Sequence, residues 1–249
     1  MKKAVLQQMQ PLDYTCEEAL NSICTALTFA GRELKKIVFT SQDPSDGKSW
    51  MTMHIAVMLA QRGRRILLID ADLRRSALVK RHRIHFDGEQ TGLAHYLTGQ
   101  CQLDDCIYET NYSGMCFLPV GRDVANPVTL LDTAYFTDTL NALTQQFDLI
   151  IIDAPPVGVV VDAAEIAGSC DGSVLVVQYN KTHLKDIAEC KRQMEQSGTP
   201  VLGCIINKVD TESLSAKKYY NRGYYRYYKK EYARDNGDGK QSGAEAKQR

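Results

Sequence analysis

Hydrophobic residues gather in short unbroken runs along this chain. The clearest run covers residues 147–153 (FDLIIID) and stops at Ala154-Pro155-Pro156. Apolar runs of this length, closed by turn-forming residues, are typical of strands buried on both faces of a parallel sheet. Similar runs lie at residues 65–72, 115–120, 173–177 and 201–206 and in the stretch that begins at Ile37. The pattern therefore predicts about six strands.

Between these runs, apolar residues recur at helical spacing. One such stretch begins at Thr15, which forms a capping-box pattern with Glu18, and ends before Gly31. Other helices are expected after the Ile37 run, near Leu93 and Leu103, after Asn126-Pro127, and over about residues 183–196. Strands that alternate with helices predict an α/β fold built on a doubly wound, mostly parallel sheet.

The composition changes abruptly after Leu214. Residues 215–249 contain no Val, Ile, Leu, Met, Phe, Trp or Cys. Such a segment has little to bury that would offset the entropy of ordering it. We therefore expect one P-loop domain over residues 1–214 and a flexible, disordered tail over residues 215–249.

The tail is basic and rich in tyrosine. It carries ten basic and four acidic residues, a net charge of +6, while the whole chain has 30 of each sign and the remaining body is therefore acidic. The balanced total excludes a global electrostatic attraction to nucleic acid. The tyrosines of the tail are Tyr219, Tyr220, Tyr224, Tyr225, Tyr227, Tyr228 and Tyr232.

The cysteines and the first residues bear on location. Eight cysteines are scattered without a C-x-x-C pair, which is typical of a reduced cytoplasmic protein. Met1-Lys2-Lys3 precedes only three apolar residues before Gln7, too few for a signal peptide, and no window is long enough to span a membrane. We expect a cytoplasmic protein that only a partner could hold at a membrane.

The triplet Gly47-Lys48-Ser49 opens the helix that follows the Ile37 run. In this position, backbone N–H groups from about Ser45 to Ser49 can wrap a polyphosphate at the positive end of the helix dipole. Lys48 can then reach the outer phosphates, and the Ser49 hydroxyl can bind Mg²⁺. Gln42 stands where the usual P-loop has its first glycine. The alternative is a plain turn in which Gly47 supplies a positive φ.

Three acidic residues lie at the ends of predicted strands. Asp153 ends the 147–153 run, as in a Walker B motif, and fits the Mg²⁺ role expected in a P-loop protein. Asp70 and Asp72 end the 65–72 run, and strand alternation would point both toward the same crevice. One could then orient a metal-bound water and the other receive a proton. The alternative is that Asp72 caps the turn beside Arg74 and Arg75.

Three segments carry a family resemblance. ILLIDADLRR resembles the second acidic Walker motif of bacterial tyrosine kinases, the P-loop enzymes of capsule and exopolysaccharide clusters. FDLIIIDAPPVGVVVDAAEIA is similar to their Walker B segment, and KKYYNRGYYRYYKKEY to their C-terminal tyrosine cluster. The likeness runs from about Thr15 to Tyr232 and is to the stand-alone cytosolic type.

The resemblance implies the following roles. The protein would be an ATP- and Mg²⁺-dependent protein-tyrosine autokinase that regulates polysaccharide polymerisation or export. Catalysis would use Lys48, Asp70, Asp72 and Asp153, with Asp72 as the base. Nucleotide would contact Ser45, Asp46, Gly47, Lys48, Ser49, Trp50 and Asn207, and Mg²⁺ would contact Ser49, Asp70 and Asp153. The seven tail tyrosines of a neighbouring protomer would be the phosphoacceptors.

The resemblance also implies partners. A transmembrane activator of the polysaccharide co-polymerase type would recruit the protein to the inner face of the membrane through its cytosolic tail, and a tyrosine phosphatase would oppose it. A homo-oligomer is expected, but the family's assembly motif E-x-x-R-x-x-R reads Glu18, Asn21, Cys24 in this chain. The phosphate loop departs from P-G-E-G-K-S-T at Ser45 and Trp50, and His54 replaces the usual Asn.

Other functions stay open at this point. A partitioning or division-site ATPase switch would share the fold, but such proteins carry a lysine at the place of Asp43. The motif Asn207-Lys208-Val209-Asp210 resembles the guanine-binding N-K-x-D, although related ATPases use an Asn there for adenine, which favours ATP. Interleaved Lys, Arg and Tyr could bind single-stranded nucleic acid, but this leaves the three acids without a role. The basic cluster 80–83 is either solvated surface or a site for an acidic partner.

Overall fold

The hydrophobic runs form six neighbouring strands of one sheet. In a computed structural model that describes residues 2–7, 9, 11–31, 33–131 and 134–210, nine strands line up in the order β4-β1-β5-β6-β3-β7-β2-β8-β9. They are β1 (Lys2–Leu6), β2 (Lys36–Ser41), β3 (Ile66–Asp70), β4 (Ile84–Phe86), β5 (Tyr108–Thr110), β6 (Met115–Leu118), β7 (Leu149–Asp153), β8 (Gly172–Gln178) and β9 (Val201–Asn207). The six predicted strands correspond to β2, β3, β6, β7, β8 and β9.

The six strands from β6 to β9 in the sheet are all parallel, which confirms the predicted doubly wound, mostly parallel sheet. The prediction missed β1, β4 and β5, which extend one edge. β5 is antiparallel to β6, while β1 is parallel to β5 and antiparallel to β4. β4 and β5 are three residues long, too short to show a hydrophobic period.

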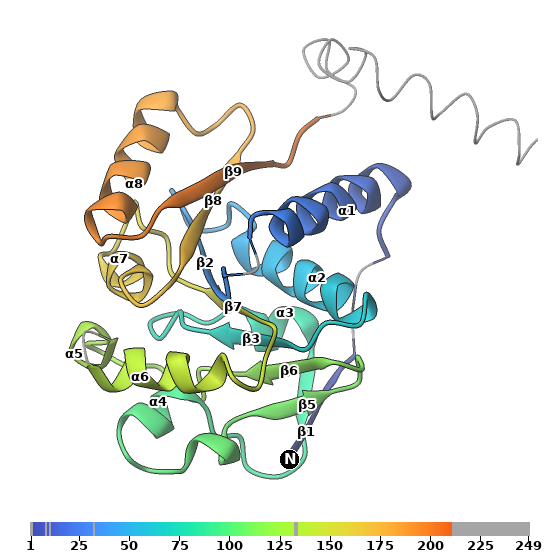
Figure 1. The fold of residues 1–249 in the computed structure, drawn as a ribbon, viewed down its shortest axis with the longest axis vertical. Coiled ribbons are helices and arrows are strands. Elements are labelled where there is room, and N and C mark those ends of the chain that lie inside the picture. The colour runs from blue at the N-terminus through green and yellow to red at the C-terminus, as the bar shows by residue number, and fades with distance from the viewer. Residues whose placement is uncertain (1, 8, 10, 32, 132–133, 211–249) are drawn as a thin grey trace, which may run out of the picture. The chain divides into compact units, whose positions relative to one another are not determined.

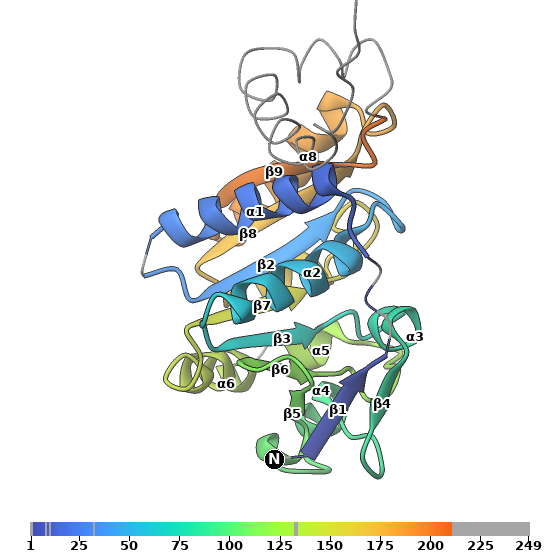
Figure 2. The ribbon, with the colours of Figure 1, turned by 90° about the vertical axis from the view of Figure 1, so that its right-hand side faces the viewer.

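Helices cover both faces of the sheet (Figures 1 and 2). One face carries α1 (Tyr14–Phe29), α2 (Lys48–Gln61) and α3 (Leu78–His82). The other carries α4 (Leu93–Leu97), α5 (Val128–Leu131), α6 (Ala134–Leu143), α7 (Asp162–Ala167) and α8 (Leu184–Gln196), and a 3-10 turn lies at Leu103–Asp105.

The central strands feed both layers alternately. In β7, Ile150 and Ile152 pack toward α6, α7 and α8, while Leu149 and Ile151 pack toward α1 and α2. β2 and β3 divide their side chains in the same way. Because successive side chains of a strand point to opposite faces, a fully apolar run is what a strand buried on both sides requires.

Two local predictions need correction. The first helix begins at Tyr14, and its N-cap is Asp13, whose carboxylate accepts the Cys16 N–H at 2.8 Å. The Thr15–Glu18 capping box was therefore wrong. The helix expected after Asn126-Pro127 is divided into α5 and α6. The basic cluster 80–83 begins within α3, and its Lys80, Arg81 and Arg83 side chains are exposed, which agrees with the surface interpretation.

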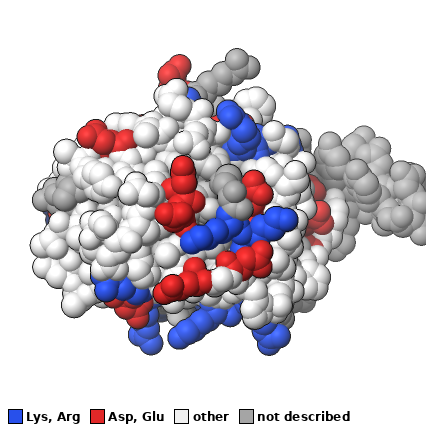
Figure 3. Space-filling view, turned by 90° about the horizontal axis from the view of Figure 1, so that it is seen from below, with Lys and Arg blue, Asp and Glu red and all other residues white. Residues whose placement is uncertain are grey.

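Residues 1–207 form one compact unit, and residues 208–249 form another, of which the structure describes 208–210. The predicted boundary at 214/215 and all seven tail tyrosines lie outside the described residues. Among the described helices, none is both long and apolar enough to cross a membrane. The face shown in Figure 3 mixes acidic and basic side chains rather than presenting a continuous basic stripe of the kind that follows a nucleic-acid backbone.

A pair of histidines lies between α2 and α3. His54 is 3% exposed, its Nε2 has no hydrogen-bond partner among the described residues, and its ring lies 4.1 Å from that of Trp50 and 6.4 Å from that of His82, centroid to centroid. Burial, together with repulsion from His82, lowers the pKa of His54 to about 4. The folded protein therefore favours neutral His54.

This burial predicts an acid-sensitive contribution to stability. An unfolded histidine has a pKa of about 6.5, so the unfolded state takes up a proton that folded His54 refuses, and stability is lost as the pH falls from about 6.5 toward 4. Urea unfolding of wild type and His54→Asn between pH 7 and pH 4.5 should show the larger decrease in wild type. His85→Asn, at an exposed position of β4, is the control and should behave as wild type. Parallel curves for wild type and His54→Asn would contradict the prediction.

Candidate functional site

The candidate site lies where β2, β7 and β3 end. These strands are neighbours in the sheet, and Asp153 at the end of β7 is in register with Phe39 of β2 and with Asp70 of β3. The backbone ladder continues past the strands, since Ala154 N–H donates to Phe39 O and Ala71 N–H to Asp153 O. The parallel sheet thus gathers the loop after β2 and the acidic ends of β3 and β7, at the edge where open α/β sheets bind ligands.

The loop between β2 and α2 has the backbone of a phosphate loop. Ser45 has φ 68° and Gly47 has φ 104°, so two residues adopt left-handed backbone conformations before α2 starts at Lys48. Gly47 O accepts the first helical hydrogen bond, from Met51 N–H. An added Cβ on Gly47 would lie 2.0 Å from Asn207 Nδ2, so this position requires glycine for its space as well as for its φ.

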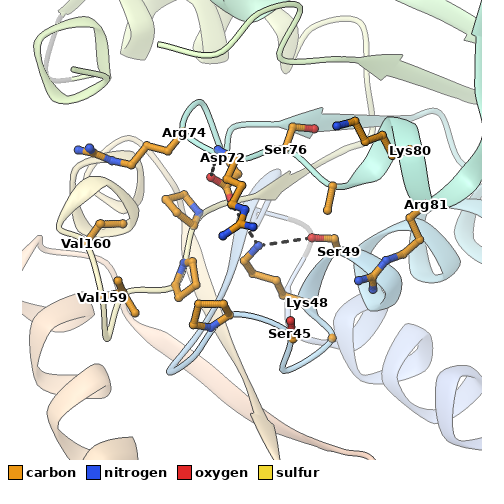
Figure 4. A pocket seen from close by; sticks show the side chains of 16 residues that line it. Ser45, Lys48, Ser49, Asp72, Arg74, Ser76, Lys80, Arg81, Val159 and Val160 are labelled. Atoms are coloured by element: carbon orange, nitrogen blue, oxygen red, sulfur yellow. Dashed lines mark hydrogen bonds and ion pairs between the residues drawn. The ribbon is translucent and has the colours of Figure 1, made fainter. Parts of the chain in front are cut away.

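Lys48 projects from the start of α2 toward Asp72 (Figure 4), and Asp153 also lies close to it. Its Nζ lies 3.5 Å from Asp72 Oδ2, 4.0 Å from Asp153 Oδ1 and 3.4 Å from Ser49 Oγ. Burial alone would lower the pKa of Lys48, but the carboxylates of Asp153, Asp72 and Asp70 together raise it above its usual value. The lysine therefore stays charged although it is buried.

Two of these acids are almost completely enclosed. Asp70 is 0% and Asp153 1% exposed. Burial, followed by repulsion from Asp153, raises the pKa of Asp70 to about 8, although a 2.5 Å hydrogen bond from Ser76 Oγ works in the opposite direction. Burial also raises the pKa of Asp153, whose Oδ1 accepts no hydrogen bond from the described residues. The positive charge of Lys48 nearby is therefore too little to offset the burial of these two carboxylates.

A Mg²⁺ ion, when bound, would supply positive charge next to these carboxylates. Among the described residues, no group of three or more His, Cys, Asp or Glu has the arrangement of an all-protein metal site. Mg²⁺ commonly uses one or two carboxylates and completes its shell with water and substrate phosphates. The Ser49 hydroxyl, Asp70 and Asp153 fit this type of donor set.

Asp72 lies in the turn after β3. Because β3 ends at Asp70, the strand alternation expected to orient Asp72 does not extend to it. Instead, Asp72 N–H donates to Asp70 Oδ1, and Asp72 Oδ1 accepts the Arg75 N–H at 3.1 Å. The other oxygen faces Lys48. Asp72 thus caps the turn, as the alternative proposed, and also reaches the site.

Arg74 was not singled out from the sequence as part of the site. Its guanidinium makes a bidentate pair with Asp162 of α7, at 2.6 and 2.9 Å, and Asp162 is 1% exposed. This geometry is the strong form of a charge-assisted hydrogen bond and fixes the turn that carries Asp72 against α7. The pairing joins residues 88 positions apart, so no local pattern announces it.

A cavity of about 820 Å³ opens in front of Lys48. Lys80 and Arg81 of the α3 region stand on one side, and Val159 and Val160 on the other (Figure 4). The apolar side continues through Pro155 and Pro156, where Thr40 of β2 holds the chain: its hydroxyl donates to Pro155 O and accepts the Val157 N–H.

The structure brings most of the predicted site residues together. Ser45, Gly47, Lys48, Ser49 and Asp72 line the cavity, and Asp70 and Asp153 lie behind them. Three others have different surroundings. Asp46 is 0% exposed, the ring of Trp50 packs at an angle of 39° against that of His54, and Asn207 donates through Nδ2 to Asp46 O at 2.8 Å.

Gln42 also has a local explanation. Its side-chain Oε1 accepts a hydrogen bond from the Cys190 thiol of α8, and its atoms lie so close to Gly158 that a Cβ there would come within 2.6 Å of Oε1. Cys190 therefore bonds to the Gln42 side chain, and Gly158, which lies outside the loop, leaves the space that this side chain needs.

Known proteins resemble this chain over most of its length, including the residues of the candidate site. A family model described as an AAA domain matches residues 34–197. The tyrosine-protein kinase CpsD of Streptococcus agalactiae is 42% identical over 207 residues, covering 83% of this chain and 90% of that protein. The kinase domain of the Escherichia coli tyrosine kinase ETK superposes with a TM-score of 0.75 at 28% identity, covering 88% of each chain. The septum site-determining protein MinD of Pyrococcus horikoshii, solved with Mg-ADP, gives 0.62 at 25% identity, covering 74% of this chain and 76% of that one.

The contact of Gly47 with Asn207 gives a direct test of the loop geometry. Gly47→Ala should lower the free energy of unfolding by about 1–3 kcal/mol, because alanine is strained at this φ and its Cβ displaces Asn207. Gly63→Ala is the matched control, since Gly63 has φ 83° with nothing within 4 Å of the added Cβ. Gly63→Ala should lower the free energy of unfolding by about 0.5–1.5 kcal/mol less than Gly47→Ala, because it leaves the Asn207 hydrogen bond intact. Equal losses in chemical denaturation would contradict the proposed contact.

Proposed function

The chain belongs to the family of bacterial tyrosine-protein kinases, and we propose that it transfers the terminal phosphoryl group of ATP to tail tyrosines of a neighbouring copy. The observation that carries the proposal is the position of Lys48. A buried ammonium group lies at the first residue of α2, within 4.0 Å of two carboxylates and beside a cavity of about 820 Å³. A lysine in this setting suits a polyphosphate with a divalent cation.

The chemistry divides among the residues as follows. The N–H groups of residues 45–49 and the ammonium group of Lys48 would bind phosphate oxygens. Ser49, Asp70 and Asp153 would hold Mg²⁺, which when bound neutralises charge on the phosphate being transferred. Asp72 is the proposed base, because its carboxylate faces both Lys48 and the cavity.

A base of this kind has a limited task. A tyrosine hydroxyl has a pKa near 10 and must lose its proton during transfer. Phosphoryl transfer passes through a loose transition state, so the positioning of the two substrates contributes more than the base. The apolar side of the cavity, with Pro155, Pro156, Val159 and Val160, offers a surface for an aromatic ring.

The proposed nucleotide is ATP. Asn207, the first residue of the N-K-x-D sequence, donates its side-chain amide to the loop carbonyl of Asp46. The MinD structure with Mg-ADP belongs to a protein of the same fold and supports an adenine nucleotide with magnesium.

Transfer between copies requires a homo-oligomer. The helix expected to carry the family's assembly arginines is α1, where Cys24 is 0% exposed and the Asn21 side chain accepts a hydrogen bond from Arg62 at 2.7 Å. Neither position can therefore reproduce an exposed arginine pair, and we propose an assembly through other contacts. Each phosphotyrosine adds about −1.5 to −2 charges, so roughly four would reverse the tail's net charge of +6. This reversal is the proposed switch of the assembly.

The biological setting is part of the proposal. We propose that the kinase regulates the polymerisation or export of a capsular or exopolysaccharide from the cytoplasmic face of the membrane. A transmembrane activator would recruit it through a cytosolic tail, and a tyrosine phosphatase would reset it. The rival function is an ATPase switch of the MinD type without kinase activity. Asp43, at the place where such switches carry a lysine, argues against it.

Transfer between copies predicts complementation. Lys48→Met keeps all seven tail tyrosines but should lose activity by about 100-fold or more, because the phosphate contact is gone. A variant with those tyrosines replaced by phenylalanine keeps the site but lacks acceptors. With ATP, Mg²⁺ and a peptide of the activator's cytosolic tail, the mixture should phosphorylate the Lys48→Met chain, as read by mass spectrometry. ATP hydrolysis without any phosphotyrosine in wild type would favour the switch.

The role assigned to Asp153 predicts a change in metal requirement. Asp153→Asn should raise the Mg²⁺ concentration for half-maximal kinase activity by about tenfold or more, since a charged ligand is replaced by a neutral one. Chelation should abolish wild-type activity, and added Mg²⁺ should restore it. Asp104→Asn, at an exposed carboxylate of the 3-10 turn, serves as the control and should titrate as wild type. An unchanged Mg²⁺ curve for Asp153→Asn would remove Asp153 from the metal site.

A further inference from the structure

The phosphate loop contains two acids of its own. Asp43 and Asp46 both lie in the turn between β2 and Lys48, a place that the proposed function gives to a polyanion. Like charges held close together in a partly buried loop repel one another more strongly than they would in water. A loop built in this way needs a positive charge from elsewhere.

Asp46 is the more demanding of the two. It is 0% exposed, and its Oδ2 accepts the Asp43 N–H at 2.9 Å. Its Oδ1 has no hydrogen-bond donor among the described residues. The ammonium group of Lys181 lies 3.6 Å from that oxygen. A buried carboxylate left without its counter-charge would be costly.

Lys181 contacts both acids from outside the loop. Its Nζ also lies 3.1 Å from Asp43 Oδ2, and the two carboxylates raise the pKa of Lys181, with Asp43 as the larger cause. The lysine belongs to the turn between β8 and α8. Its N–H donates to Gln178 O, and Asn180 beside it takes φ 58°. A short, hydrogen-bonded turn therefore presents the ammonium group to the loop.

The same loop is held from a second direction. Asn207, at the end of β9, donates to the carbonyl of Asp46, while its own carbonyl accepts the Tyr179 N–H from the turn that carries Lys181. Lys181, in the turn after β8, thus contacts the side chain of Asp46, and Asn207, at the end of β9, contacts its backbone. The backbone N–H groups that follow Asp46 begin the phosphate-binding segment, so the placement of Asp46 affects them directly.

We propose that Lys181 is a positioning residue for the phosphate loop, which neutralises Asp43 and Asp46 and so lets the loop accept a polyphosphate. The inference rests on the proposed nucleotide function of this loop. Lys181 acts through the two carboxylates and does not contact the phosphates itself. Without it, the charge of Asp46 opposes the incoming phosphates, and the Asp46 carboxylate loses its contact from outside the loop.

An ordinary surface ion pair is the competing explanation. The Lys181 side chain is 47% exposed, and exposed pairs contribute about 0–1 kcal/mol to stability. That explanation predicts a slight change in stability and none in nucleotide affinity. The two explanations therefore differ in binding, not in folding.

The test compares nucleotide affinity among matched variants. Lys181→Met keeps the length of the side chain without its charge, and Lys181→Arg keeps the charge. Lys191→Met is the control, because Lys191 pairs with Glu195 on the neighbouring α8 at 3.6 Å with similar exposure. Calorimetry with a non-hydrolysable ATP analogue and Mg²⁺ should show affinity about tenfold weaker for Lys181→Met and unchanged for Lys191→Met. Lys181→Arg should lie close to wild type, and kinase assays should show a raised KM for ATP with kcat within about twofold.

A double-mutant cycle tests whether Lys181 acts through Asp46. In an Asp46→Asn background, the buried charge is absent, so Lys181→Met should weaken binding less than twofold. An equal effect in both backgrounds would overturn the inference, as would wild-type affinity in Lys181→Met that is folded by circular dichroism. Wild-type protein that binds no analogue would overturn the proposed function, and this inference with it.

Discussion

The repulsion among three buried carboxylates governs this site. Parallel pairing of β3 with β7 sets Asp70 beside Asp153, and the turn after β3 adds Asp72. Within the described residues, Lys48 is the buried cation placed among them, and one ammonium group cannot neutralise three acids. Burial, with this repulsion added to it, raises the pKa of Asp70 and Asp153, and one oxygen of Asp153 has no hydrogen-bond donor among the described residues. Uncompensated carboxylates of this kind at the carboxyl ends of the strands would suit the divalent cation of the proposed function.

The surrounding fold keeps that group of charges in place. The central strands are apolar on both faces, so α1 and α2 on one side and α6 to α8 on the other fix the strand ends from which the acids project. The pair of Arg74 with Asp162 then ties the turn of Asp72 to α7 across the sheet edge. Thr40 holds the proline pair that forms the apolar side of the cavity. Charge and apolar surface thus meet at Lys48, as transfer to an aromatic hydroxyl requires.

The features that the sequence predicted well depend on long, uniform patterns. β7 and the predicted order of strands and helices follow from apolar runs. The family resemblance came from segments that include the ends of two such runs, at Asp70 and Asp153, and from the tyrosine cluster. The kinase family is confirmed by relatives that cover most of the chain. The misses were short or distant. β4 and β5 have three residues each, the Asp13 cap competes with a plausible Thr15 pattern, and the partner of Arg74 lies 88 residues away. Local sequence contains no signal for contacts of that kind.

The unusual phosphate loop shows why a motif is best judged together with its neighbours. Several departures from the usual pattern have partners in the structure. Gln42 bonds to Cys190 of α8, the Asp46 carbonyl accepts from Asn207 of β9, and the ring of Trp50 lies 4.1 Å from that of His54 within α2. Asp46 is 0% exposed, with contacts to both its backbone carbonyl and its carboxylate. These contacts explain how a loop without the first glycine of the motif keeps a defined backbone, and local comparison with the motif cannot reveal them because the partners come from α8, β9 and the turn after β8.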